Sequence, residues 1–247
     1  MNRIIKKFHH FSNHPEQAQL VNFIRIGIAL LTLIKIWTYF PIAQSDSIFQ
    51  ACWLIIALMS SLLLLINRFT KVVLVILIMI FIAGFFDYMI ELRPLYLRSH
   101  HMQLLIISYL GLLLMGRQKG NHHYGMGFQL LRLTIILVYL AAIVMKLTPH
   151  YYSGLHIQQL FYKYYWGSDR LNSTWFEIVC QAIAIGSIFT EAAILATATF
   201  LKRPRLALKI GIAFHLVLFL VLPVSILSGL MILLLFLFQE KQFKYPI

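Results

Sequence analysis

Long apolar runs separated by short polar segments recur along the whole chain. Six runs, of 14 to 26 residues, contain few charged side chains: 20–40, 48–66, 72–90, 102–115, 127–147 and 175–200. A helix of about 20 residues crosses the ~30 Å hydrocarbon layer of a bilayer. The pattern therefore predicts membrane-spanning helices, with polar connections between them.

A seventh apolar run, 207–238, is too long for one span and too short for two full ones. Pro223, Ser225 and Ser228 interrupt it, which predicts two short helices or one broken helix. Such breaks occur at membrane depth only where they are buried in protein or face a cavity, so this one hints at a site. The tyrosine-rich segment 148–174 is expected to contain an interfacial helix at the outer face, after the fifth span.

These elements predict an all-α, polytopic transmembrane helix bundle of about seven to eight segments. The expected organisation is a basic N-terminal segment, 1–19, a single membrane domain, 20–238, and a short tail, 239–247. Composition agrees, because 60% of the 247 residues are apolar and only 12% are charged. Cys52 and Cys180 each lie inside a predicted span without metal-ligand spacing around them, so neither a disulfide nor a metal site is expected.

The net charge of +13 is explained by topology. With the N-terminus in the cytoplasm, thirteen of the 21 lysines and arginines fall at inner positions: Arg3, Lys6, Lys7, Arg68, Lys71, Arg117, Lys119, Lys202, Arg203, Arg205, Lys209, Lys241 and Lys244. Basic loops are retained in the cytoplasm. Both termini are therefore expected there, and the membrane is expected to be a bacterial cytoplasmic membrane. No nucleic-acid partner is needed to account for the charge.

Polar residues inside the spans are candidate site residues, because burying them in hydrocarbon is costly. Arg132, Tyr139 and Lys146 are seven residues apart, so they share one helix face with a drift of only ~20° per step. Glu191 is a candidate counter-ion for Arg132. Other titratable residues converge on the outer half of the membrane: Asp87, Glu91, His100, His101 and His215.

Each candidate also has a structural interpretation. Lys146 could extend its ammonium to the outer interface, as lysines at helix ends do. His215 could bond a facing carbonyl, and His100 and His101 could be solvated by an aqueous loop. Arg132 with Glu191 could form an ion pair that serves only the fold.

Four stretches resemble the vitamin K-dependent gamma-carboxylase-like family, also called the horizontally transferred transmembrane (HTTM) domain family. The most specific is Tyr139-x-x-Ala142-x-x-x-Lys146-Leu147 followed by Tyr151 and Gly154, which resembles the family's lysine-bearing helix. The others are FIRIGIALL (23–31), SHHMQLLIISYLGLLLM (99–115) and GIAFHLVLFL (211–220), in the family's order. A full carboxylase continues into a large extramembrane region that this sequence does not contain, which leaves recognition of a peptide substrate in question.

The resemblance implies a site open to the outer side of the membrane. Lys146 would be the base that acts on a quinol such as vitamin K hydroquinone, since an amine in an apolar pocket can accept a proton. His101 would steady negative charge on the quinone. The side chains expected to contact this lipid are those of His215, Tyr139, Arg132 and His100.

Two hypotheses follow. The first is a carboxylase-like or quinol-epoxidase-like membrane enzyme, with an outer-leaflet pocket for a quinol or another isoprenoid-like lipid. The second is a non-catalytic membrane partner for the maturation or export of a secreted peptide, with Lys146 and the histidines holding a helix interface. A transporter is a weaker third, because the spans show no repeated halves.

Overall fold

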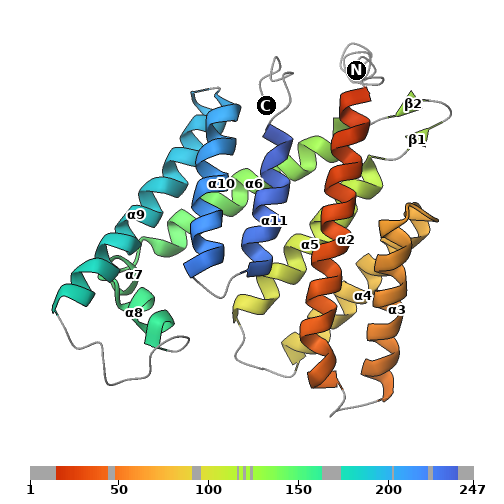
Figure 1. Cartoon of the computed structure of the whole chain (residues 1–247), viewed down its shortest axis with the longest axis horizontal. Coiled ribbons are helices and arrows are strands. Elements are labelled where there is room, and N and C mark those ends of the chain that lie inside the picture. Colours follow the sequence, from red (N-terminus) through yellow and green to blue (C-terminus); the bar gives the residue numbers. More distant parts are fainter. Residues whose placement is uncertain are drawn as a thin grey trace. The chain divides into compact units, whose positions relative to one another are not determined.

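The computed structural model describes the chain over most of its length, namely residues 15–43, 48–90, 96–115, 117–118, 121–122, 125–162, 174–201, 203–221 and 225–238. Side chains are described for 18–37, 52–84, 102–115, 126–162, 174–201, 203–220 and 226–238. The chain divides into two compact units, Met1–Arg132 and Leu133–Ile247, and each is considered by itself (Figure 1).

The first unit contains four long helices that pack against one another. They are α2 (Pro15–Ala43), α3 (Ile48–Leu65), α4 (Thr70–Ile90) and α5 (Tyr96–Leu114), and each packs against the next while α2 also contacts α5. Asn67 and Phe69 adopt positive φ in the tight turn between α3 and α4. Two antiparallel strands of two residues each, β1 (Arg117–Gln118) and β2 (Asn121–His122), precede α6 (Gly125–Lys146).

Buried polar groups connect the helices of this unit. The Arg25 guanidinium on α2 donates to the carbonyls of Leu64 and Leu65. These carbonyls lie at the end of α3, where backbone acceptors have no partner within the helix. Thr32 on α2 and Tyr109 on α5 are both fully buried, and their hydroxyl oxygens are 2.6 Å apart. Polar residues in these apolar helices therefore serve to fix one helix against another.

The second unit begins within α6 and contains α7 (Pro149–Tyr152), α8 (Leu155–Phe161), α9 (Thr174–Thr199), α10 (Pro204–Val221), α11 (Ser225–Leu235) and the 3₁₀ turn η2 (Phe236–Phe238). Helix α10 packs against both α9 and α11. Gly211, near the start of α10, lies against Leu235 at the end of α11, so these two helices are antiparallel. The apolar run 207–238 thus forms two helices rather than one broken helix.

The described chain is almost entirely helical, and three of its helical segments are long and apolar enough to cross a membrane. These are Ala18–Trp37, Met126–Lys146 and Thr174–Thr199. Shorter apolar segments include Cys52–Leu65, Thr70–Gly84, Met102–Leu114 and Ile226–Phe238. Large apolar side chains such as Phe189 and Leu220 are more than two-thirds exposed. A helix that is apolar on its outer face as well as its inner one is typical of a membrane protein.

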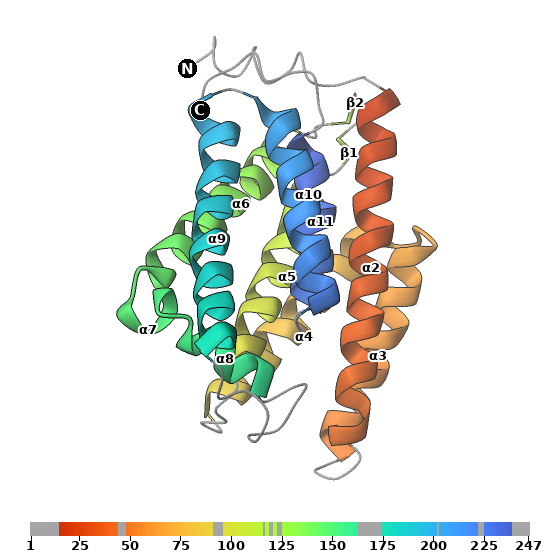
Figure 2. The same ribbon diagram turned by 60° about the vertical axis from the view of Figure 1, so that its left-hand side comes forward.

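The segment after α6 differs from the expected interfacial helix. It forms two short helices, α7 and α8, that pack along α9 (Figures 1 and 2). Between them Gly154 has φ of 83°, and a Cβ there would lie 2.5 Å from the backbone nitrogen of Gln181. Glycine is thus required both for the left-handed turn and for the close approach to α9.

Candidate functional site

An ion pair connects the end of α6 with α9. The Lys146 ammonium donates to Glu191 Oε1 at 2.6 Å, and the two side chains are 19% and 7% exposed. Lys146 is the last residue of α6, while Glu191 lies in the apolar middle of α9. Each charge therefore offsets the cost of removing the other from water.

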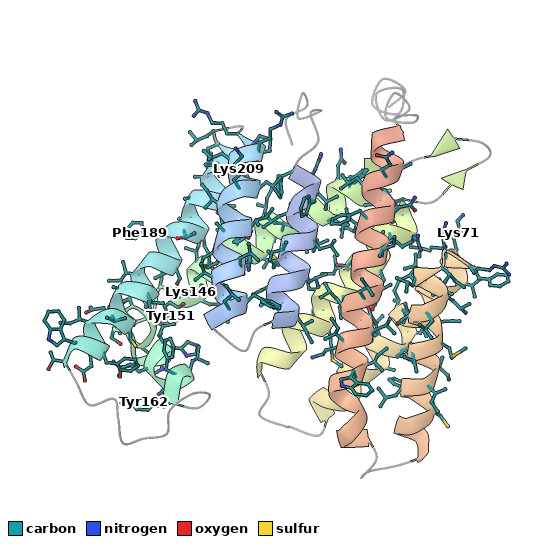
Figure 3. All side chains as sticks on the ribbon, in the orientation of Figure 1. Lys71, Lys146, Tyr151, Tyr162, Phe189 and Lys209 are labelled. Carbon is teal, nitrogen blue, oxygen red and sulfur yellow. The ribbon has the colours of Figure 1, made fainter. Side chains whose placement is uncertain are left out.

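Aromatic rings surround the Lys146 ammonium. Its Nζ atom is 5.3 Å from the centre of the Tyr151 ring and 5.9 Å from that of Phe214. Both distances are within the range of cation–π attraction. Tyr151 comes from α7 and Phe214 from α10, so Lys146 is enclosed by elements that are far apart in the sequence. Figure 3 shows Lys146 and Tyr151 next to each other along α9.

A second buried pair joins α6 to α10. The Tyr139 hydroxyl is 2.8 Å from His215 Nε2, and the exposed fractions of these two residues are 2% and 5%. Tyr139 lies two turns before Lys146 on the same helix, and His215 directly follows Phe214. Because the Phe214 ring also faces the Lys146 ammonium, the two pairs are neighbours, and their four side chains are called the cluster below.

Two polar atoms of this cluster are buried and have no hydrogen-bond partner among the described residues. They are Glu191 Oε2 and His215 Nδ1. Buried polar atoms are nearly always bonded, and each unpaired one costs free energy. A further molecule could therefore donate a hydrogen bond to Glu191 Oε2. It could also bond His215 Nδ1, which donates or accepts according to the tautomer of the ring.

Polar and aromatic groups continue from Lys146 along α7 and α8. Ser187 donates to the Ala184 carbonyl at 2.8 Å and accepts from the Tyr151 hydroxyl at 2.9 Å. The ring centres of Tyr151 and His156 are 5.5 Å apart, and those of His156 and His150 are 6.2 Å apart. Burial of His156, which lies outside the long apolar helices, lowers its pKa, and the nearby His150 and Lys146 lower the pKa further.

The structure brings together three of the predicted site residues, Lys146, Tyr139 and His215. Arg132 belongs to the first unit, where its guanidinium carbon is 5.9 Å from the centre of the Phe128 ring. The ion pair observed for Glu191 is with Lys146, and the predicted Arg132–Glu191 pair, which would join the two units, stays a prediction.

Other predicted site residues lie partly or wholly outside the described part. His100 and His101 lie in the second turn of α5, because that helix begins at Tyr96, and Asp87 lies in α4, but none of these three side chains is described. Glu91 is outside the described residues. Their roles therefore stay predictions.

Glu191 and Ser187 are the residues of the site whose partners the sequence did not identify. The signal for Glu191 was present, because a carboxylate within an apolar helix requires a cation. Spacing along α6 placed Arg132, Tyr139 and Lys146 on one face but left open which of the two cations meets α9. That choice depends on how α6 packs against α9.

No group of three or more metal-ligating side chains is close enough to hold a metal ion within the described ranges. Comparisons of the chain with family models, with curated proteins and with solved structures found no match.

Proposed function

We propose that this chain is an integral membrane protein of the gamma-carboxylase-like HTTM family, with seven or eight membrane segments and both termini on the cytoplasmic side of a bacterial cytoplasmic membrane. The four stretches that resemble the family support this assignment. The helices α2, α3, α4, α5, α6, α9, α10 and α11 agree with the number of segments. The distribution of basic residues supports the orientation.

The proposed function is the binding of a quinol or another isoprenoid-like lipid from the outer leaflet, followed by removal of its hydroxyl proton. One observation carries this proposal: Glu191 Oε2 and His215 Nδ1 are buried next to Lys146 and have no partner among the described residues. A hydroxyl group can donate to the carboxylate, and a hydroxyl or carbonyl group can bond the imidazole. An isoprenoid tail would remain in hydrocarbon.

Lys146 would serve as the general base, but only as a neutral amine. Its contact with Glu191 gives a route to that form, because a proton can move from the ammonium to Oε1 across the 2.6 Å hydrogen bond. A neutral amine beside a neutral acid also avoids burying two charges in an apolar setting. The amine then accepts the proton of the lipid hydroxyl, while Tyr139 fixes the His215 ring that orients the lipid.

The direct test is mass spectrometry of lipids and quinones that co-purify with the protein. Lys146→Met keeps the length of the side chain and removes the amine. The expected result is loss of the bound quinone or of the associated cellular phenotype at matched amounts of membrane-inserted protein, because the unpaired Glu191 carboxylate also lowers stability. Lys209→Met is the matched control, because Lys209 is exposed near the start of α10, at the far end of this unit from α8 (Figure 3). Full function in Lys146→Met would rule out a base at this position.

The second candidate function is that of a non-catalytic membrane partner for the maturation or export of a secreted peptide. The Lys146–Glu191 ion pair favours it, since such a pair can serve the fold alone. The double variant Lys146→Met/Glu191→Gln separates the two functions, because it removes both charges and leaves neither unpaired. A double variant that folds and keeps the phenotype, without bound quinone in the native protein, would establish the partner role. Loss of function in a stable double variant supports the enzyme.

A further inference from the structure

The depth of α7 and α8 can be measured along α9, which is itself long and apolar enough to span a membrane. Lys146 bonds Glu191, Tyr151 bonds Ser187, and Gly154 packs on Gln181. Successive residues after α6 therefore contact positions of α9 that lie progressively closer to its start at Thr174. With a rise of ~1.5 Å per residue, the distance from Glu191 to Gln181 is ~15 Å and that from Gln181 to Thr174 is a further ~10 Å.

This order places the break after α6 within the span rather than beyond its end. Helix α6 stops at Lys146, and the chain continues through a four-residue helix, a left-handed glycine and a seven-residue helix. The interrupted backbone thus runs beside α9 for ~15 Å, which equals about half the thickness of the hydrocarbon layer. Both ribbon views show α7 and α8 beside the part of α9 that lies toward its start at Thr174, away from the end that leads into α10 (Figures 1 and 2).

An interrupted backbone at such depth occurs only where protein buries it or where it lines a water-filled space. Protein buries only part of this one, because Gly154 is packed against α9 whereas Thr148, Pro149 and His150 are all exposed. Thr148 also has an extended backbone, and its side chain does not cap the helix that follows. The carbonyls of Thr148, Pro149 and His150 accept hydrogen bonds within this segment, so the cost falls on the exposed imidazole. An imidazole exposed to lipid would cost several kcal/mol, whereas exposure to water removes that cost.

We infer that residues 148–156 form the wall of a water-filled inlet that enters from the α8 end of α9 and reaches the Lys146–Glu191 pair. His150, His156 and Tyr151 line it, and the Tyr151 ring lies next to both the His156 ring and the ammonium. The occupant is water, which supplies and removes protons at a pair otherwise enclosed by apolar helices. The inlet is inferred independently of the proposed function, except that its opening toward the outer side of the membrane rests on that proposal.

Thiol labelling tests the inlet. In a protein carrying Cys52→Ser and Cys180→Ala, His150→Cys is compared with Phe189→Cys, using a membrane-impermeant thiosulfonate on intact cells. Phe189 is the matched control, because it is 71% exposed and lies on α9 between Ser187 and Glu191, at the depth of the inlet's inner part (Figure 3). The reagent reacts with the thiolate, which forms in water and not in lipid, so His150→Cys should react about tenfold faster or more.

Three outcomes would overturn the inference. The first is equal reaction at the two positions, and the second is reaction of both only with a lipid-permeant maleimide. The third is reaction of His150→Cys only in inside-out vesicles, which would also reverse the proposed topology. Thr148→Cys provides an independent second position, since its side chain is exposed and makes no cap. Labelling does not require a bound quinone, so a labelled inlet without quinone would contradict the proposed function and leave the inlet intact.

Discussion

Gly154 is the residue that allows α8 to lie against α9. Replacing it with alanine is expected to destabilise the protein, because a non-glycine residue in the left-handed region costs ~1–2 kcal/mol. The new methyl group would also overlap the backbone of Cys180 and Gln181, which cannot move without shifting α9. Thermal unfolding in detergent should show a lower midpoint for Gly154→Ala than for the native protein.

Gly186 is the control for that change, because a Cβ there meets no atom within 4 Å. It lies within α9, where alanine is favoured over glycine by up to ~1 kcal/mol. Gly186→Ala should therefore unfold at the same temperature as the native protein or a higher one. A Gly154→Ala protein as stable as Gly186→Ala would contradict the close packing of α8 on α9.

The partner of Glu191 shows what the sequence can and cannot establish about single residues. The need for a cation followed from an acid in an apolar helix, and the shared face of Tyr139 and Lys146 followed from their spacing. Spacing describes one helix, whereas an ion pair depends on two. The spacing of residues along α6 could therefore not show that Lys146 pairs with Glu191 or that Tyr139 bonds His215.

The Lys146–Glu191 pair leads to a prediction about charge balance. Glu191→Gln leaves the ammonium without its carboxylate, and removing one member of a buried pair typically costs ~3–5 kcal/mol. Its midpoint of thermal unfolding should fall clearly, and adding Lys146→Met should restore most of the loss. A double variant no more stable than Glu191→Gln alone would show that the two side chains do not stabilise each other.

At the scale of elements, the contact of α2 with α5 can be tested through the hydrogen bond of Thr32 with Tyr109. Thr32 donates to the Ile28 carbonyl at 2.7 Å, so the Tyr109 hydroxyl is the donor between the helices. Tyr109→Phe should destabilise by ~0.6 kcal/mol, the average for such bonds between membrane helices, and by no more than ~1.7 kcal/mol, the largest value found for them. Tyr152→Phe, at a position 45% exposed, should change the unfolding midpoint little. If the two changes lowered the unfolding midpoint equally, the Thr32–Tyr109 hydrogen bond would not stabilise the packing of α2 against α5.

Helix positions were largely predictable, because each of the seven apolar runs coincides with a helix or, for 207–238, with a pair of helices. Apolar length alone determines where such a helix lies in the sequence. In the segment after α6, a helix was expected and α8 is one, while its place at the outer interface stays a prediction. Pro149 and Gly154 did mark a break. Its position beside α9, however, arises from contacts with Ser187 and Gln181 that no local pattern contains.

At the scale of the whole molecule, the two ends of the second unit differ in character. Arg203, Arg205 and Lys209 lie where α9 ends and α10 begins, whereas α8 and its aromatic neighbours lie near the start of α9. A helix that spans the membrane places these ends on opposite sides. Basic residues favour the cytoplasmic side, so the α8 end should face outward together with the inlet to Lys146.

Orientation can be measured with single cysteines in the protein that lacks Cys52 and Cys180. The loops at 67–71, 117–126 and 201–206 should be cytoplasmic, since thirteen of 21 basic residues lie on that side and only four in the outer loops. A membrane-impermeant maleimide should therefore label Ser168→Cys in intact cells and Gln118→Cys only after permeabilisation. The opposite pattern would place the basic loops outside, against the retention of positive charge. It would also turn the Lys146 end of the second unit toward the cytoplasm, where a lipid of the outer leaflet could not reach it.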